Sequence, residues 1–156
     1  MKKYYSSSFL IEKNLLTTEE IDKTKYYYEV EFMLSLNCNV AKVYFQNEIK
    51  SIIFYDIDFN NNVLTYTLQN FGNIKIVTYH NLSDTIKITK TYNEGSLFAI
   101  WTYKYDIDYR LNISILQDSL NILIEYRQSV YDEAGNHIKE KIFFADSWTI
   151  HTEKMI

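Results

Sequence analysis

The stretch SLFAIWTYKY, residues 96–105, places large side chains at every second position, with Trp101 and Tyr103 among them. In a β-strand successive side chains leave the backbone on opposite faces, so this period of two predicts a strand half-buried in an antiparallel sheet. The side chains that fill the stretch are mostly aromatic or β-branched, and these suit a pleated surface. We therefore expect a strand here and look for its neighbours on both sides.

The same two-residue rhythm continues along most of the chain. DTIKITKTY, residues 84–92, alternates isoleucines with lysines and threonines, and NILIEYRQ, residues 121–128, sets apolar side chains against Glu125 and Arg127. Clusters of turn-forming residues separate such runs at intervals of roughly 8–12 residues, as in sandwiches, barrels and meanders. The short connections favour hairpins between neighbours. We predict an all-β fold: a single antiparallel sheet of about ten strands in largely up-and-down order, either curved or closed into a barrel.

The N-terminal part of the chain has a different pattern. Thr17 is followed three residues later by Glu20, the spacing of a capping box at the start of a helix. We expect one short helix at about 18–25. Residues 1–25 are then an N-terminal extension of the same domain, and the antiparallel β part spans 26–156.

YDEAGN, residues 131–136, has the composition of a hairpin loop, because Asp132 can accept from backbone amides and Gly135 can adopt a left-handed conformation. The stretch Tyr131-Asp132-Glu133-Ala134-Gly135-Asn136-His137-Ile138 also resembles a YD repeat of Rhs-type proteins. Tyr92-Asn93-Glu94-Gly95-Ser96-Leu97, which runs on to Tyr105-Asp106, resembles a looser copy, and Tyr55-Asp56 is a third dipeptide without the glycine. The resemblance implies a shared hairpin and no activity.

DIDFNNN, residues 56–62, begins with the acidic spacing of a calcium-binding loop. An EF-hand loop needs Gly at its sixth position and Glu at its twelfth, and this chain has Asn61 and Thr67 there. We therefore expect an asparagine-rich hairpin turn between two strands. The acids of the two DID sequences could also form a glycosidase pair, whose roles depend on their separation.

Charge and composition limit the classes of partner. The net charge is −4, with 16 basic residues scattered among 20 acidic ones. Nucleic-acid binding needs clustered basic residues, so a basic protein is the expected partner. The chain shows neither an apolar run long enough for a membrane span nor a signal peptide, and we expect a cytoplasmic protein. The absence of proline and the abundance of Ile, Asn, Tyr and Lys indicate an AT-rich bacterial or phage genome.

Motifs for chemistry are sparse. Cys38 is the single cysteine, so we expect a small buried side chain and neither a disulfide nor a thiolate metal site. The three histidines have no metal-ligand spacing, and the three isolated glycines cannot form a phosphate-binding loop. We expect no metal and no cofactor. Whether the chain is an enzyme stays open, with a binding role favoured.

Two functions fit these observations. The first is a small acidic immunity or inhibitor protein that neutralises a basic toxin or effector by surface complementarity. Its partner-binding residues would be acids and tyrosines at turns and strand ends: Asp56, Asp58, Asp106, Asp108, Tyr103, Tyr105, Asp132 and Glu133. The alternative is a lipocalin-like barrel that binds or processes a small apolar ligand, with Tyr and Trp side chains lining its interior.

Overall fold

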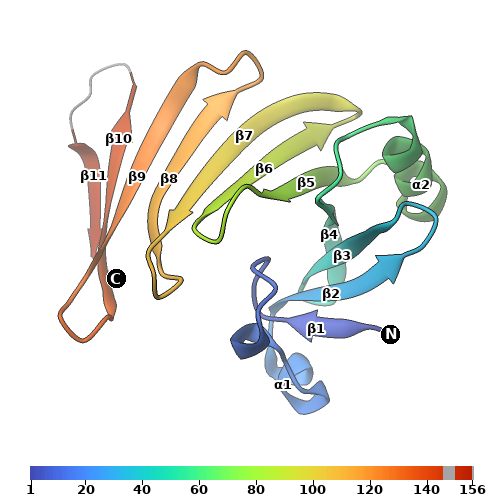
Figure 1. The fold of residues 1–156 in the computed structure, drawn as a ribbon, viewed down its shortest axis with the longest axis horizontal. Helices are drawn as coiled ribbons and strands as arrows, with labels where there is room; N and C mark the ends of the chain where they lie inside the picture. The colour runs from blue at the N-terminus through green and yellow to red at the C-terminus, as the bar shows by residue number, and fades with distance from the viewer. Residues whose placement is uncertain (146–149, 156) are drawn as a thin grey trace. The chain divides into compact units, whose positions relative to one another are not determined.

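The computed structural model describes residues 1–145 and 150–155, and its strands follow one another in the sheet in chain order (Figure 1). The strands are β1 (Lys3–Tyr5), β2 (Tyr26–Met33), β3 (Cys38–Phe45), β4 (Glu48–Tyr55), β5 (Lys75–Asn81), β6 (Ile86–Asn93), β7 (Ser96–Tyr105), β8 (Leu111–Asp118), β9 (Leu123–Tyr131), β10 (His137–Phe144) and β11 (Ile150–Met155). The order is linear, with β1 and β11 as its end strands. The prediction of a mostly β fold in up-and-down order is confirmed.

One connection departs from the hairpin pattern. β4 and β5 pair in parallel, and the helix α2 (Asn61–Phe71) joins them. The expected asparagine-rich hairpin turn at 56–62 is therefore wrong. Asn60 caps the helix instead, because its side-chain oxygen accepts a hydrogen bond from Val63 N at 3.0 Å. Asparagine favours turns and helix N-caps alike, and the buried Val63 and Thr67 at helical spacing show which role applies here.

The predicted N-terminal helix is confirmed as α1 (Thr18–Lys23), preceded by a 3₁₀ turn at Glu12–Asn14. Its capping box is complete: Glu20 N donates to Thr17 Oγ1 at 3.3 Å, and Thr17 N donates to Glu20 Oε2 at 2.6 Å. Within the described part of the chain, no helix combines the length and apolar character needed to cross a membrane.

Residue contacts divide the chain into two compact units. The first contains Met1–Tyr79 and Thr91–Ser96, and the second contains His80–Lys90 and Leu97–Ile156. The boundaries fall within β5, β6 and β7, where no linker-like composition marks them. The single domain expected from the sequence stays a prediction, and each unit is described by itself.

The first unit has a core on each face of its strands. On one face, α2 packs on the sheet through Val63, and Ile52 and Phe54 of β4 are fully buried beneath it. Cys38 belongs to this cluster and is 6 % exposed, which confirms its expected burial. On the other face, the N-terminal segment is held where Tyr55 Oη donates to Ser8 O at 3.0 Å. These two cores explain how a chain without disulfides stabilises this unit.

The second unit contains an antiparallel meander of β7 to β11, with no helix among its described residues. Figure 1 shows these strands side by side in a single layer. The register defines two faces. We call one of them the Trp101 face, and it carries the side chains of Trp101, Tyr103, Ser114, Glu125, Arg127, Ser129 and Glu140.

Three successive turns in the second unit share one architecture. In each, an Asp accepts at its carbonyl from the residue three positions later and donates its N–H to the carbonyl four positions later: Asp106, Asp118 and Asp132. The fourth residue of each turn has a positive φ: 60° at Tyr109, 64° at Asn121 and 84° at Gly135. The hairpin predicted at YDEAGN is therefore confirmed, with a register shift beside it in β10. This combination is a type I turn followed by a left-handed residue and a bulge.

Two alternating strands bury their polar side chains. Lys87 in β6 is 4 % exposed and Glu125 in β9 is 6 % exposed, whereas Ile124 is 41 % exposed. Alternation normally places the apolar set inside. Here the buried charges have partners, since Lys87 Nζ donates to Ser83 O at 2.7 Å and Arg127 pairs with Glu125. Burial of a charge is tolerated where such partners exist.

Candidate protein-binding surface

The eight predicted binding residues fall in both units. Asp56 and Asp58 follow β4 in the first unit. The other six lie in the second unit, at the end of β7 or in the β7–β8 and β9–β10 turns: Tyr103, Tyr105, Asp106, Asp108, Asp132 and Glu133. Because β8 pairs with β9, these two turns lie at the same end of the meander. We call residues 106–110 and 132–136 together the acidic turn pair.

Arg110 connects the two turns. Its guanidinium carbon lies 5.0 Å from the centre of the Tyr131 ring, a cation–π distance. Its Nη1 lies 2.9 Å from the point where a Cβ on Gly135 would be, so the glycine leaves room for it. Tyr131 Oη donates a hydrogen bond back to Leu111 O. These contacts hold the β7–β8 and β9–β10 turns against each other.

Asp106 shapes its own turn. Its Oδ1 accepts from Asp108 N at 2.9 Å and from Arg110 N at 3.0 Å, and its Oδ2 accepts from Arg110 Nε at 2.8 Å. The backbone hydrogen bond from Arg110, together with the nearby guanidinium, holds the pKa of Asp106 below its ordinary value. Three donors stabilise the charged form of a carboxylate. Asp106 is therefore ionised and its oxygens are occupied within the turn.

Asp132 has the same role in the β9–β10 turn. Its Oδ1 accepts from Asn136 N at 2.8 Å and its Oδ2 accepts from Asn136 Nδ2 at 3.1 Å. The backbone bond from Asn136 comes first among the causes that lower the pKa of Asp132. A sequence pattern cannot distinguish such a turn-capping carboxylate from one that faces a partner, since both are Asp at a turn.

Asp108 and Glu133 present their carboxylates to solvent. The Asp108 side chain is 70 % exposed and its Oδ2 lies 3.5 Å from Arg110 Nη2. Glu133 is exposed in the neighbouring turn. Arg110 is the one basic residue among the four carboxylates of the acidic turn pair. The end of the meander is therefore negatively charged on a well-ordered backbone.

Sequence reasoning missed the charged centre of the Trp101 face. Arg127 Nη2 donates to both carboxylate oxygens of Glu125, at 3.1 and 3.2 Å, and Nη1 lies 3.6 Å from Glu140 Oε1. The Arg127 guanidinium also lies 5.4 Å from the Trp101 ring centre. The available signal was Glu125 and Arg127 at alternate positions of one strand, which places both on one face.

Aromatic rings extend this centre toward the acidic turn pair. Trp101 and Tyr103 stack with ring centres 5.9 Å apart and an angle of 15° between their planes. Tyr105 follows at the end of β7, and burial raises its pKa to about 12. Tyr131, which is on the Trp101 face by register, stacks beneath Arg110. Trp, Tyr and Arg are the residues most enriched at the energetic centres of protein interfaces.

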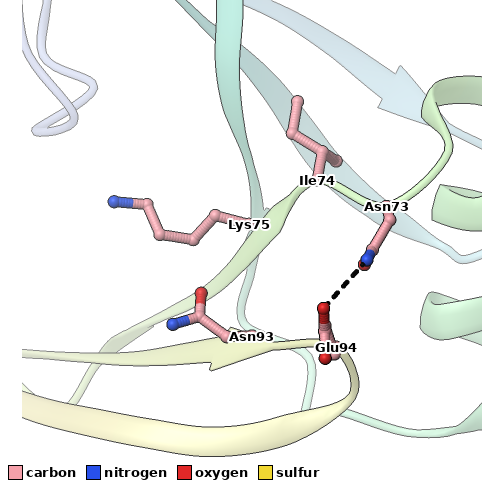
Figure 2. A pocket seen from close by; sticks show the side chains of 5 residues that line it. All are labelled: Asn73, Ile74, Lys75, Asn93 and Glu94. Carbon is pink, nitrogen blue, oxygen red and sulfur yellow. Dashed lines mark hydrogen bonds between the residues drawn. The ribbon is translucent and has the colours of Figure 1, made fainter.

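Two open hollows lie in the first unit. Figure 2 shows the smaller one, of ≈ 250 Å³, between the start of β5 and the β6–β7 turn. Asn73 Nδ2 donates to Glu94 Oε1 at 3.4 Å across its rim, and the side chains of Lys75 and Asn93 border the same space. The other hollow, of ≈ 350 Å³, lies between the end of α1 and the β3–β4 turn. Both are bordered mainly by polar side chains.

Metal-ligand geometry was tested over the part of the chain that the structure describes, and no group of His, Cys, Asp and Glu there could hold an ion. The arrangement in the second unit instead offers charge, aromatic surface and rigid turns. Comparison with protein-family models, curated proteins and solved structures returned no match for this chain.

Proposed function

We propose that this chain is a binding protein of the immunity or inhibitor type, which neutralises a basic toxin or effector protein in the cytoplasm of a bacterium. The observation that carries the proposal is the acidic turn pair: four carboxylates around one guanidinium, on two turns held together by Arg110. A preorganised surface of one charge steers an oppositely charged partner and raises its rate of association.

The Trp101 face supports the same function. It supplies Trp101 and Tyr103 as large ring surfaces beside Arg127, and it adjoins the acidic turn pair through Tyr131. Aromatic and arginine side chains provide most of the binding energy in protein interfaces, while charges at the rim set specificity. A partner that covers this face and the turns would meet both kinds of contact.

The lipocalin-like alternative receives no support from this geometry. The strand order is linear, and the two hollows are open and bordered mainly by polar side chains. A site for a small apolar ligand is concave and mostly apolar.

The experiment starts from the genes adjacent to the one that encodes this chain. Each neighbouring product is expressed alone and with the full chain in a bacterial host, and growth is measured. We expect one basic product to stop growth alone and to be neutralised by co-expression, with a 1:1 complex in calorimetry. If no neighbouring product is both toxic and bound, the proposal fails.

Charge variants then test the surface. Asp108→Lys combined with Glu133→Lys should slow association, most strongly at low salt, because both carboxylates face solvent. The matched control is Glu19→Lys combined with Asp22→Lys in α1, which changes the net charge equally at exposed positions of the first unit. Asp106→Lys is a poor test, since it removes the hydrogen bonds that form the turn. Equal association rates for both pairs would show that the acidic turn pair does not contact the partner.

A further inference from the structure

The β7–β8 turn exposes apolar side chains at its tip. Ile107 is 88 % exposed and Tyr109 is 44 % exposed. We propose that this turn is the anchor of the interface, which inserts Ile107 and Tyr109 into an apolar pocket on the basic protein partner. The inference rests on the proposed function and adds to it the chemistry of the contact: an apolar pocket whose rim carries Lys or Arg side chains.

Comparison of the three Asp-initiated turns separates the β7–β8 turn from its neighbours. At the fourth position, where φ is positive, the β8–β9 turn has Asn121 and the β9–β10 turn has Gly135. These two residue types tolerate the left-handed conformation well, whereas a bulky aromatic residue does so at a cost. Tyr109 adopts it with φ of 60°. A large ring at this position lowers stability and gains only exposed surface, which is the pattern of a residue retained for binding.

The turn is also ordered before any partner arrives. Asp106 accepts from two backbone amides and from Arg110 Nε, and Arg110 in turn lies on the Tyr131 ring. Preorganisation of this kind reduces the entropy lost on binding, so more of the contact energy of an inserted side chain appears as affinity. The exposed tip and the fixed base together make a rigid projection.

The charge beside the tip defines the partner. Asp108 lies between Ile107 and Tyr109 in sequence, and its side chain is 70 % exposed. Glu133 lies in the adjacent turn, which Arg110 holds against this one. When Ile107 enters a pocket, these carboxylates approach its rim, and like charges there would repel them. A basic rim is therefore the complementary one.

The test uses the neighbouring product that the full chain neutralises, and calorimetry and stopped-flow kinetics with single variants. Ile107→Ser and Tyr109→Ser should each weaken binding by about tenfold or more, mainly through faster dissociation, because they remove anchor side chains from a desolvated contact. Circular dichroism and thermal unfolding check that the variants remain folded. Leu120→Ser is the matched control, since Leu120 is 75 % exposed in the β8–β9 turn of the same architecture.

The outcomes separate the two proposals. Binding by Ile107→Ser within about twofold of the unaltered chain, a difference of less than half a kcal/mol, overturns the anchor while the inhibitor function stands. Equal losses for Ile107→Ser and Leu120→Ser overturn it too, because the contact would then not be specific to this turn. If the unaltered chain neutralises no neighbouring product, both proposals fail. Replacement of Ile107 by p-benzoylphenylalanine adds a direct readout: its photocrosslink should map to an apolar pocket bordered by Lys or Arg, and a crosslink to an acidic surface contradicts the inference.

Discussion

Gly135→Ala tests whether the β7–β8 and β9–β10 turns pack together as the acidic turn pair requires. Gly135 has φ of +84°, and a Cβ placed there would lie 2.9 Å from Arg110 Nη1. The left-handed conformation costs an L-residue roughly 1–2 kcal/mol. The close contact adds to this, because Arg110 must leave its place between Asp106 and the Tyr131 ring. We expect the substitution to lower the free energy of unfolding by about 2 kcal/mol in all.

The chain offers a matched control for the backbone part of this cost. Gly72 has φ of +71°, and a Cβ there would meet nothing within 4 Å. Gly72→Ala should therefore report the conformational cost alone, about 1 kcal/mol. Urea unfolding followed by circular dichroism measures both variants. For a chain of this length each kcal/mol also shifts the melting temperature by roughly 2–4 °C.

A double-mutant cycle isolates the contact. In the Arg110→Ala background the Cβ at position 135 has space, so Gly135→Ala should cost less there, by about 0.5 kcal/mol or more. Equal costs of Gly135→Ala in both backgrounds would mean that Arg110 does not lie against Gly135, and the basis for treating the two turns as one surface would be lost.

Three further predictions follow from the same geometry. Tyr109→Gly should stabilise the fold by about 0.5–1 kcal/mol in urea unfolding, since it relieves the left-handed strain, and Tyr109→Ala should not, since it keeps it. Glu29 has a lowered pKa because the hydrogen bond and charge of Lys42 outweigh its burial; its contribution to stability is present above pH ~4.5 and lost as the pH falls through the lowered pKa. Glu29→Gln should therefore flatten the acid side of the stability profile, and an unchanged slope would contradict this. Burial raises the pKa of Tyr105 to about 12, so stability should fall as the pH rises from ~10 toward that value; tyrosinate absorbance should show this late titration, and Tyr105→Phe should remove it.

Much of the fold could be predicted from local pattern. Thr17 and Glu20 indicated α1, the two-residue rhythm indicated strands such as β7, and YDEAGN indicated its hairpin, since each of these signals depends on neighbours in sequence. α2 was missed because Asn60 and the asparagines after it suit a turn as well as a helix start. The distinction required knowledge of what Val63 packs against.

The candidate site was predicted in part. Asp106 and Asp132 were selected as acids at turns, but the structure shows that their carboxylates stabilise those turns, while Asp108 and Glu133 face solvent. Whether any of the eight selected residues binds a partner stays a prediction. Ile107 was not selected, because a single exposed isoleucine in a loop has no signature until its exposure is known.

The sequence alone determined which segments are strands and where several chain reversals occur, because alternation, capping and turn formation involve residues only a few positions apart. The tertiary structure alone decided which side of each strand is buried, and that Arg110 joins turns more than twenty residues apart. The physical reason is that burial and charge pairing depend on side chains from other strands. Glu125 shows this most directly: its own strand reads as if it should face water, and Arg127 and the surrounding side chains bury it.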